Sequence, residues 1–318
     1  MVSRYLSRNG TYGSGTAPAD PPPDIRSLLW DMLRQIPRGS VTTYGALAES
    51  LGDRAAARAV GSLLSENPTP PDPPCHRVVY ADGRTGWYKG KGKGAEEKIS
   101  LLRDEGVDVI DGRVDLKDHI FRDFDTVPVL QSLMAEQVTL SENIVYDGGP
   151  LPDTLSAIDV SYRGDTAYAA RVDFSFQDGS ELGQGRARTT VAFPYIPGYL
   201  SFREAEAMEP LLVDDGRLHV IDGNGILHPR GAGIACHLGR GGHRTMGAAK
   251  SLLTGELSGS SIILDGEERG RKVGKYFVSV GNLVDLSQAE EALSRMLEMG
   301  VDPCRRAHSE ATRFKKSV

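Results

Sequence analysis

Cys75 has the features of a catalytic nucleophile and lies in a proline-rich loop, Pro73-Pro-Cys-His-Arg-Val-Val79. The thiolate is the reactive form of cysteine, and a neighbouring base or cation favours its formation at neutral pH. His76 adjoins the cysteine, and Glu105 lies downstream at the end of an expected helix. Sequence spacing alone does not bring Glu105 to His76, and a lone cysteine is more often a small buried hydrophobic residue. Both interpretations of Cys75 stay open at this point.

Three carboxylates in the second half of the chain have the pattern of a site for a hard metal ion. Asp159 interrupts an apolar strand, where a buried carboxylate without a partner costs several kcal/mol. Asp222 closes the apolar run that begins at Leu218, and Glu204 lies at the start of an expected helix. Oxygen ligands from separate elements are what Mg²⁺ requires. Each acid alone could also be a helix cap or a turn former, and Asp159 fits that alternative least.

A stiff turn, Pro194-Tyr-Ile-Pro-Gly198, presents Tyr195 and Ile196 at its tip. Such a tip suits a wedge between base steps, and it equally suits packing on its own domain. His228 and His237 flank a Gly-rich loop, and histidines at this spacing are as often structural as functional.

The helix before Cys75 carries mostly small residues over 55–62, with Arg58 as the exception. Recognition helices of the major groove usually carry long polar side chains. A helix with small side chains suits close approach to the minor groove, where one arginine could fill the gap left by a flipped base. The alternative is a helix that is tightly packed in a core.

Short helices are the elements expected to position Cys75. Apolar residues recur at helical spacing from Ile25, and Pro37 and Gly39 end this first helix. Two further helices, over residues 40–52 and 54–67, predict a helix-turn-helix. The remaining expected segments of this half are a loop over 69–94, a helix over 96–105, and a linker with short strands over 106–125.

The second half combines strands and helices, which predicts a mixed α/β fold that starts with antiparallel strands. A helix is expected near 127–140. The expected strands cover 156–162, 166–176, 188–193, 218–221, 261–264 and 276–280. The expected helices cover 201–211, 246–253 and 287–299.

Length and composition indicate two globular modules, since 318 residues exceed the usual size of one domain. No apolar run approaches the ~18 residues of a membrane span, which excludes an integral membrane protein. Three scattered cysteines exclude a disulfide framework and favour a reducing, cytoplasmic location. The net charge of −6 argues against a protein that coats nucleic acid as a polycation. Residues 24–117 are neutral, residues 118–318 carry a net charge of −7, and residues 1–23 are expected to be a disordered leader.

Residues 24–110 resemble the C-terminal, DNA-binding domain of the O6-alkylguanine-DNA alkyltransferases. The matching motifs are Val41-Thr-Thr-Tyr-Gly-Ala-Leu-Ala48, Ala57-Arg-Ala-Val-Gly61, Asn67-Pro68, Pro74-Cys-His-Arg-Val-Val79, Gly86-Trp-Tyr-Lys-Gly90 and Leu101-Leu-Arg-Asp-Glu-Gly106. The resemblance implies that Cys75 accepts the alkyl group and that His76 and Glu105 activate it through a water. It further implies that Tyr44 helps to rotate the 3′ phosphate, Arg58 replaces the flipped guanine, Asn67 orients the active-site loop and Tyr88 lines the base pocket. The lysines of the loop 89–94 depart from the family and are expected to add phosphate affinity.

Residues 127–318 resemble endonuclease V, the deoxyinosine 3′ endonuclease. The matching motifs are Ala157-Ile-Asp-Val-Ser-Tyr162, Pro194-Tyr-Ile-Pro-Gly198, Phe202-Arg-Glu-Ala205, Val220-Ile-Asp-Gly-Asn-Gly-Ile-Leu-His-Pro-Arg230, Gly247-Ala-Ala-Lys-Ser251 and Arg306-Ala-His-Ser309. The resemblance implies a ribonuclease H-like fold. It places Asp159, Glu204, Asp222 and His308 around Mg²⁺, with Mn²⁺ as a substitute and no organic cofactor. It also implies that His228, His237 and Lys250 position the phosphate or activate water. Tyr195 and Ile196 would form a strand-separating wedge. Gly225, Gly231 and Gly233 would shape the pocket for hypoxanthine.

Together these features predict a bifunctional DNA-repair enzyme that acts on double-stranded or locally single-stranded DNA. A small winged-helix-like domain (24–117) is expected to transfer the alkyl group to Cys75 once per molecule. After a linker (118–126), an α/β domain (127–318) is expected to cleave the second phosphodiester 3′ to deoxyinosine. The expected state is a monomer without a membrane partner. Two alternatives are a first domain that only senses alkylated bases, and a nuclease that acts on inosine in RNA.

Overall fold

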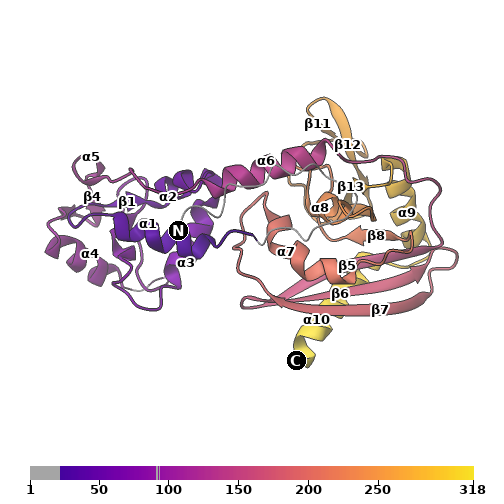
Figure 1. Cartoon of the computed structure of the whole chain (residues 1–318), viewed down its shortest axis with the longest axis horizontal. Coiled ribbons are helices and arrows are strands. Elements are labelled where there is room, and N and C mark those ends of the chain that lie inside the picture. The colour runs from indigo at the N-terminus through magenta and orange to yellow at the C-terminus, as the bar shows by residue number, and fades with distance from the viewer. Residues whose placement is uncertain (1–21, 91, 93) are drawn as a thin grey trace.

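The computed structural model describes residues 22–90, 92 and 94–318, so that nearly all of the predicted leader lies outside the described residues. A helical domain and a larger domain built on one sheet lie side by side (Figure 1). Helix α6 (Val129–Ser141) extends along both of them. The described part of the chain contains no helix that is long and apolar enough to cross a membrane.

Capped short helices form the core of the first domain. Asp24 caps α1 (Ile25–Gln35) by accepting a hydrogen bond from the Ser27 backbone N–H, and Thr43 caps α2 (Tyr44–Ser50) in the same way. The predicted helix-turn-helix is completed by η2 (Arg54–Ala56) and α3 (Ala57–Ser65). One apolar face of each helix is buried in a common core.

Cys75 lies in a single turn, η3 (Cys75–Arg77), that follows the proline-rich loop. Strand β2 (Val78–Val79) comes directly after it and pairs in parallel with β1 (Thr42–Thr43), which holds the turn beside the start of α2. The domain is completed by α4 (Ala95–Asp104), β3 (Val109–Ile110), β4 (Arg113–Val114) and α5 (Leu116–His119).

A nine-stranded mixed sheet organises the second domain, in the order β10-β11-β12-β13-β9-β8-β5-β6-β7. Strands β5, β6 and β7 are antiparallel, whereas β8 and β9 run parallel to β5. This mixed α/β architecture confirms the predicted fold class. The strands are β5 (Thr154–Arg163), β6 (Thr166–Ser175), β7 (Glu181–Thr190), β8 (Leu218–Ile221), β9 (Arg244–Ala249), β10 (Glu256–Ser258), β11 (Ser261–Leu264), β12 (Glu267–Val273) and β13 (Tyr276–Asn282).

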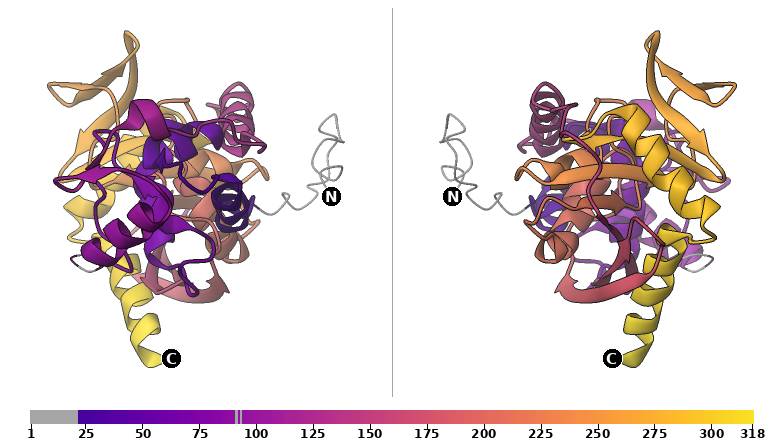
Figure 2. Two further views of the ribbon diagram at one scale, coloured as in Figure 1. Left: turned by 90° about the vertical axis from the view of Figure 1, so that its left-hand side faces the viewer. Right: turned by 90° about the vertical axis from the view of Figure 1, so that its right-hand side faces the viewer.

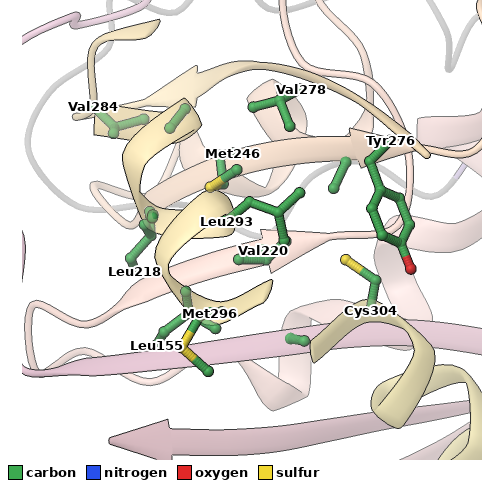
Figure 3. Close-up of a cluster of buried hydrophobic side chains, with 14 of the residues drawn as sticks. Leu155, Leu218, Val220, Met246, Tyr276, Val278, Val284, Leu293, Met296 and Cys304 are labelled. Carbon is green, nitrogen blue, oxygen red and sulfur yellow. The ribbon is translucent and has the colours of Figure 1, made fainter. Parts of the chain in front are cut away.

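Helices cover both faces of this sheet. Strand β5 is therefore buried on both sides, and its alternate residues lie in different cores. On one face, α9 (Leu286–Glu298) and α10 (Pro303–Ser317) pack with Leu155 and Ala157 (Figure 3). On the other face, α7 (Leu200–Met208) and α8 (Ile234–Gly239) pack with Ile158. A one-turn helix, η4 (Glu209–Leu211), follows α7. The hairpin of β11 and β12 projects from the body of the domain (Figure 2).

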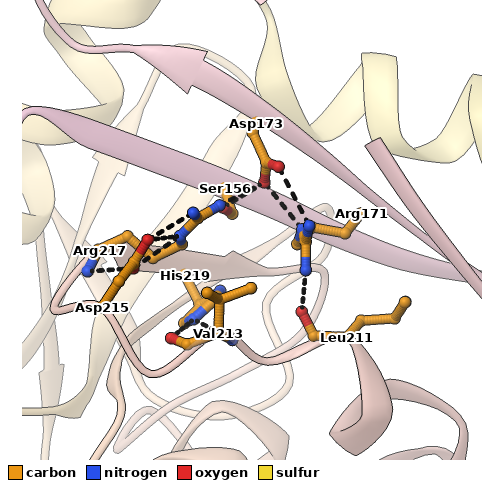
Figure 4. Close-up of polar contacts among 8 residues, drawn as sticks. All are labelled: Ser156, Arg171, Asp173, Leu211, Val213, Asp215, Arg217 and His219. Carbon is orange, nitrogen blue, oxygen red and sulfur yellow. Dashed lines mark hydrogen bonds and ion pairs between the residues drawn. The ribbon is translucent and has the colours of Figure 1, made fainter. Parts of the chain in front are cut away.

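A polar network joins β5, β6 and β8 near the start of β5 (Figure 4). Asp173 accepts a hydrogen bond from the Ser156 hydroxyl (2.6 Å) and pairs with Arg171 (2.8 Å) and Arg217 (2.9 Å). Arg217 also pairs with Asp215 in the loop before β8. The buried charge of Asp173 is therefore compensated, and the strands are fixed relative to one another.

One predicted helix is wrong. A helix is expected over residues 246–253, but the first half of this segment, 246–249, belongs to β9, a central strand, and the second half is not helical either. A Cβ on Gly247 would lie 2.5 Å from the Gly223 carbonyl oxygen, so the small residue permits close packing of backbone. Helix α10 and the first half of β7 were not expected. The predictions for β8 and β11 agree with the structure residue for residue.

The two domains share one apolar core. Leu130 of α6 and Phe193 and Tyr199 of the second domain pack with Leu51 and its neighbours in the first. The Leu130 backbone N–H donates to the Leu51 carbonyl (2.9 Å). The junction therefore has fixed contacts on both sides.

Candidate active sites

Cys75 borders a cavity of about 550 Å³ in the first domain. The cysteine is 7% exposed, so its thiol is reached through this cavity. The cavity wall includes residues of α2, α3 and the loop after β2: Tyr44, Ala57, Arg58, Gly61, Ser62, Leu64, Ser65, Tyr80, Trp87, Tyr88, Lys89 and Gly90. Four of the predicted site residues, Tyr44, Arg58, Cys75 and Tyr88, therefore face one space.

Asn67 holds the cysteine loop in place. Its side-chain amide donates to the Pro73 carbonyl (3.0 Å) and to the Cys75 sulfur (3.3 Å). Asn67 lies just after the end of α3, so the helix-turn-helix and the loop are joined at the reactive atom.

His76 and Glu105 lie together, although 29 residues separate them in the sequence. His76 Nε2 is 3.1 Å from Glu105 Oε1, and Arg77 binds both carboxylate oxygens at 2.8 and 2.7 Å. Burial raises the pKa of Glu105, but the hydrogen bonds from Arg77 and His76 outweigh it and hold the pKa below its ordinary value. Burial lowers the pKa of His76 despite Glu105, so the imidazole is neutral at pH 7. Its Nδ1 is buried and has no protein partner among the described residues.

Lys98 is a site residue that the sequence analysis missed. It is 1% exposed, and its Nζ donates to the Val78 carbonyl at 2.6 Å. Burial lowers its pKa to about 8. Burial also raises the pKa of Cys75, and Asn67, Lys98 and Lys89 act in the opposite direction. The position of Lys98 on the buried face of α4 was the signal in the sequence, because a lysine there needs a polar partner.

Tyr44 and Tyr88 both line the cavity. Burial raises the pKa of Tyr44 to about 12, so its hydroxyl is a hydrogen-bond donor at neutral pH. The Tyr88 hydroxyl is buried without a protein partner among the described residues. Arg58 is exposed on α3. Of the loop lysines, Lys91 and Lys93 lie outside the described residues.

The second site forms where β8 and β9 end, beside the middle of the neighbouring parallel strand β5. Asp159 lies on β5, Asp222 follows β8 and Lys250 follows β9. The Asp222 backbone N–H donates to the Ile158 carbonyl (3.1 Å), which brings Asp222 beside Asp159. Lys250 Nζ binds the Asp222 carboxylate and lies 3.8 Å from Asp159 Oδ2. His308 of α10 lies 2.7 Å from the same Asp159 oxygen through Nδ1.

Glu204 approaches the two aspartates from α7. It accepts a hydrogen bond from the Tyr162 hydroxyl at 3.1 Å. Burial, together with the charges of Asp159 and Asp222, raises the pKa of Glu204 to about 7. Burial and the neighbouring Asp222 raise the pKa of Asp159 to about 6. Three carboxylates that repel one another in a buried site are stabilised by a cation.

The chemistry of this donor set fits a hard divalent ion. The ammonium of Lys250 already bridges Asp159 and Asp222, which marks the place where positive charge is needed. As they stand, no three His, Cys, Asp or Glu side chains of the described residues are arranged to hold a metal ion.

A cavity of about 230 Å³ adjoins this site. Its wall includes Asp222, Lys250, Tyr195 and His228. It also includes Gly233, one of the glycines expected to form the base pocket. Tyr195 is 62% exposed, as expected for a tip residue. His228 is buried, and its ring nitrogens bind the Gly198 carbonyl and the Arg230 backbone N–H. Burial lowers its pKa to about 4, so His228 holds the turn of Tyr195 as a neutral side chain.

Two expectations for this site are corrected by the structure. Ile196 does not form an exposed tip, because its side chain is fully buried in the core shared by the domains. His237 is buried in α8 against Phe202, with ring centroids 5.5 Å apart. Burial lowers its pKa to about 3. His237 is therefore a neutral, buried residue that packs against Phe202, and not an exposed donor.

Comparison with known proteins relates both halves of the chain to families. Residues 24–107 match the family model of the 6-O-methylguanine DNA methyltransferase, DNA binding domain, and residues 133–309 match that of endonuclease V. A bifunctional methyltransferase/endonuclease of Picrophilus torridus is 37% identical and covers 88% of this chain and 91% of its own length. One of Thermoplasma volcanium is 38% identical, with 84% and 82% covered. The crystal structure of endonuclease V from Streptomyces avermitilis is 30% identical with a TM-score of 0.53, and covers 59% of this chain and 93% of its own.

Proposed function

The chain belongs to the bifunctional methyltransferase/endonuclease family, and on that basis we propose a specific reaction for each of its two sites. Residues 24–117 transfer an alkyl group from O6-alkylguanine in DNA to Cys75. Residues 127–318 hydrolyse DNA at the second phosphodiester 3′ to deoxyinosine, with Mg²⁺ bound. Residues 118–126 connect the two.

In the transfer reaction, Cys75 Sγ attacks the alkyl carbon, the bond between that carbon and guanine O6 breaks, and the electron pair stays on the guanine. The thiol proton leaves through the neutral His76, whose pairing with Glu105 stabilises the imidazolium that forms. Lys98 lies beside the developing thiolate and favours it. The thioether product has no good leaving group, so each molecule reacts once.

The cavity at Cys75 provides the space for a flipped base. Its volume of about 550 Å³ fits the size of small-molecule pockets. Tyr88 lines the cavity and offers an unpaired hydroxyl to the base. Tyr44 stands at the entrance as a donor to the backbone phosphate, and Arg58 projects from α3 to fill the gap in the stack.

In the cleavage reaction, Asp159, Asp222 and Glu204 would hold the divalent ion. When bound, this ion lowers the pKa of a water molecule and stabilises the charge on the leaving oxygen. His308 orients Asp159 by its bond to Oδ2. Lys250, which lies between the two aspartates, would be available to a phosphate oxygen when the ion is bound, while Tyr195 presents an exposed ring to the bases.

The bond from Asn67 to the sulfur of Cys75, beside an open cavity, is the observation that best supports transfer. Two short duplexes test the assignment, one with O6-methylguanine and one with deoxyinosine. We expect Cys75→Ala to lose only transfer and Asp159→Asn to lose only cleavage. A matched inosine-containing RNA tests substrate class, and equal or faster cleavage of the RNA contradicts a preference for DNA.

A further inference from the structure

A groove of about 330 Å³ lies between the two domains and adjoins both cavities described above. We call it the interdomain groove. Arg26, Arg58 and Ser62 line it from the first domain, and Gly164, Tyr195 and Arg203 line it from the second. Helix α3 lies on the side of the first domain that is nearer to the sheet, and α4 lies on the far side (Figure 1).

The groove shares residues with each active-site cavity. Arg58 and Ser62 belong both to the groove and to the cavity of Cys75. Tyr195 belongs both to the groove and to the cavity beside Asp222 and Lys250. The interdomain groove therefore borders both the alkyl-acceptor cavity and the nuclease cavity through shared wall residues.

Arg58 is the arginine of this groove that is available to a ligand. Arg26 pairs with Glu66 at 2.7 Å. The Arg203 guanidinium donates to the Phe193 carbonyl and lies 4.6 Å from the centre of the Tyr162 ring. Arg58, by contrast, is exposed and forms no ion pair with any described residue. An exposed guanidinium beside the exposed ring of Tyr195 suits a backbone phosphate and an unstacked base.

The walls of the groove are held in fixed positions. The Tyr199 hydroxyl donates to Asp53 Oδ2 at 2.6 Å, and Asp53 Oδ1 caps the turn that leads into α3. The guanidinium of Arg230 lies 4.5 Å from the centre of the Tyr199 ring. These contacts join the base of α3 to the turn that carries Tyr195. The distance between Arg58 and Tyr195 is therefore set by packing and not by a flexible linker.

The acidic charge of the second half of the chain makes a cation from the first domain useful for binding DNA. Residues 118–318, which comprise the linker and the second domain, carry a net charge of −7, which opposes binding of a polyanion. A cation supplied by the neutral first domain offsets part of that repulsion.

We propose that one DNA molecule follows the interdomain groove and contacts both domains, and that Arg58 binds the backbone of DNA that is being cleaved at the nuclease site. This inference rests on the proposed cleavage activity. Arg58 is in this role a residue for substrate binding in the nuclease reaction, in addition to its role beside Cys75.

The test compares Arg58→Glu with Arg54→Glu on a short deoxyinosine duplex without alkylated guanine. Both changes reverse one positive charge, but Arg54 lies on η2 outside the groove and pairs with Glu49 at 3.0 Å. Arg58→Glu is expected to raise the KM of cleavage about tenfold and to make its salt dependence shallower by about one unit of log–log slope. Arg54→Glu is expected to change KM by less than about twofold. Ser62→Arg adds a cation to the same wall and is expected to lower KM.

Equal KM values for Arg58→Glu and Arg54→Glu would overturn the inference, and so would an unchanged KM in Ser62→Arg. Stoichiometry gives a readout that does not need cleavage. A fluorescent deoxyinosine duplex, titrated at protein concentrations far above Kd, should saturate at one duplex per chain. Two duplexes per chain would show separate sites and contradict the shared groove. If the wild-type protein binds one duplex but does not cleave it, the proposed cleavage fails while the groove stands.

Discussion

The Tyr199 hydroxyl of the second domain donates a hydrogen bond to Asp53 of the first, with an oxygen–oxygen distance of 2.6 Å. Asp53 caps the turn before α3, and Tyr199 follows the turn that carries Tyr195. The helix that faces the alkyl-acceptor cavity and the loop that faces the nuclease cavity are thus connected by a partly buried hydrogen bond. The two domains are consequently expected to unfold as one unit.

Tyr199→Phe tests this connection. Loss of a hydrogen bond to a charged group should cost about 1.5–3 kcal/mol of unfolding free energy. The loss should also lower the midpoint of thermal unfolding, which calorimetry detects. Tyr146→Phe is the matched control, since Tyr146 is 45% exposed. A single transition with an unchanged midpoint in Tyr199→Phe would contradict this role.

Glu105→Gln should destabilise the first domain at neutral pH, because it removes the carboxylate that pairs with Arg77 and His76. The pKa of Glu105 is held below its ordinary value of 4.5. Its contribution to stability is therefore complete above that ordinary value and is lost as the pH falls through the lower value of the folded state. Urea denaturation should show a loss of about 2–4 kcal/mol at pH 7.

Urea denaturation of Glu105→Gln and of the wild type at acidic pH checks that the ion pairs are the source of the difference in stability. The difference between the variant and the wild type should shrink as the wild-type carboxylate becomes protonated. Glu96→Gln, at an exposed position in the first turn of α4, should cost no more than about 0.5 kcal/mol. A difference for Glu105→Gln that stays constant from pH 7 to pH 3 would argue against the ion pairs as its source.

Lys98→Gln should slow alkyl transfer at pH 7. Burial keeps the pKa of Cys75 above its ordinary value, so the reactive thiolate is a minor species and the rate rises with pH. Lys98 lowers the thiol pKa, and its removal should reduce the rate severalfold and move the pH–rate profile toward higher pH. Because the pKa of Lys98 is itself about 8, the difference from wild type should narrow above that pH. Single-turnover rates from pH 6 to pH 10 measure this.

Lys117→Gln serves as the control for Lys98→Gln, since it removes an exposed lysine of α5. Its profile should coincide with that of the wild type. A Lys98→Gln protein that is folded by circular dichroism and reacts with the wild-type profile would remove Lys98 from the site.

Asp159→Asn should reduce cleavage by about a thousandfold or more, as expected for loss of a metal ligand. In the protein without divalent ions, the same change should increase stability at neutral pH. The pKa of Asp159 is raised to about 6, so its favourable protonated form is lost as the pH rises through that value. Calorimetry should also show weaker binding of Mg²⁺. Asp153→Asn, at an exposed position beside β5, should change none of these quantities.

Helices and strands with strong local sequence patterns could be predicted from the sequence. The apolar run Leu218–Ile221 became β8 and the helix from Ile25 ended before Pro37. Strand β9 could not be recognised, because Gly247 and its alanines are selected by close packing between strands and not by strand propensity. Helix α10 was missed because its buried side chains, such as Ala307 and Ala311, are small and give a weak apolar pattern.

The candidate sites could also be predicted only in part from the sequence. The residue types at Cys75 and Asp159 indicated chemistry, but the partners that set their protonation come from distant segments. Lys98 reaches the Cys75 loop from α4, and Tyr162 meets Glu204 across the face of the sheet. Ile196 was misplaced for a related reason. An apolar residue at the tip of a turn is predicted to be exposed when the domain that covers it is not known.

The measurement that tests the central claim most directly is the intact mass of the protein after incubation with an O6-methylguanine duplex, for the wild type and for Cys75→Ala. The wild type should gain one methyl group, about 14 Da, in proportion to the lesion supplied, because transfer is stoichiometric. Cys75→Ala should bind the duplex without a change in mass. A wild-type protein that binds the duplex and gains no mass would contradict alkyl transfer and leave the first domain as a sensor of damaged bases.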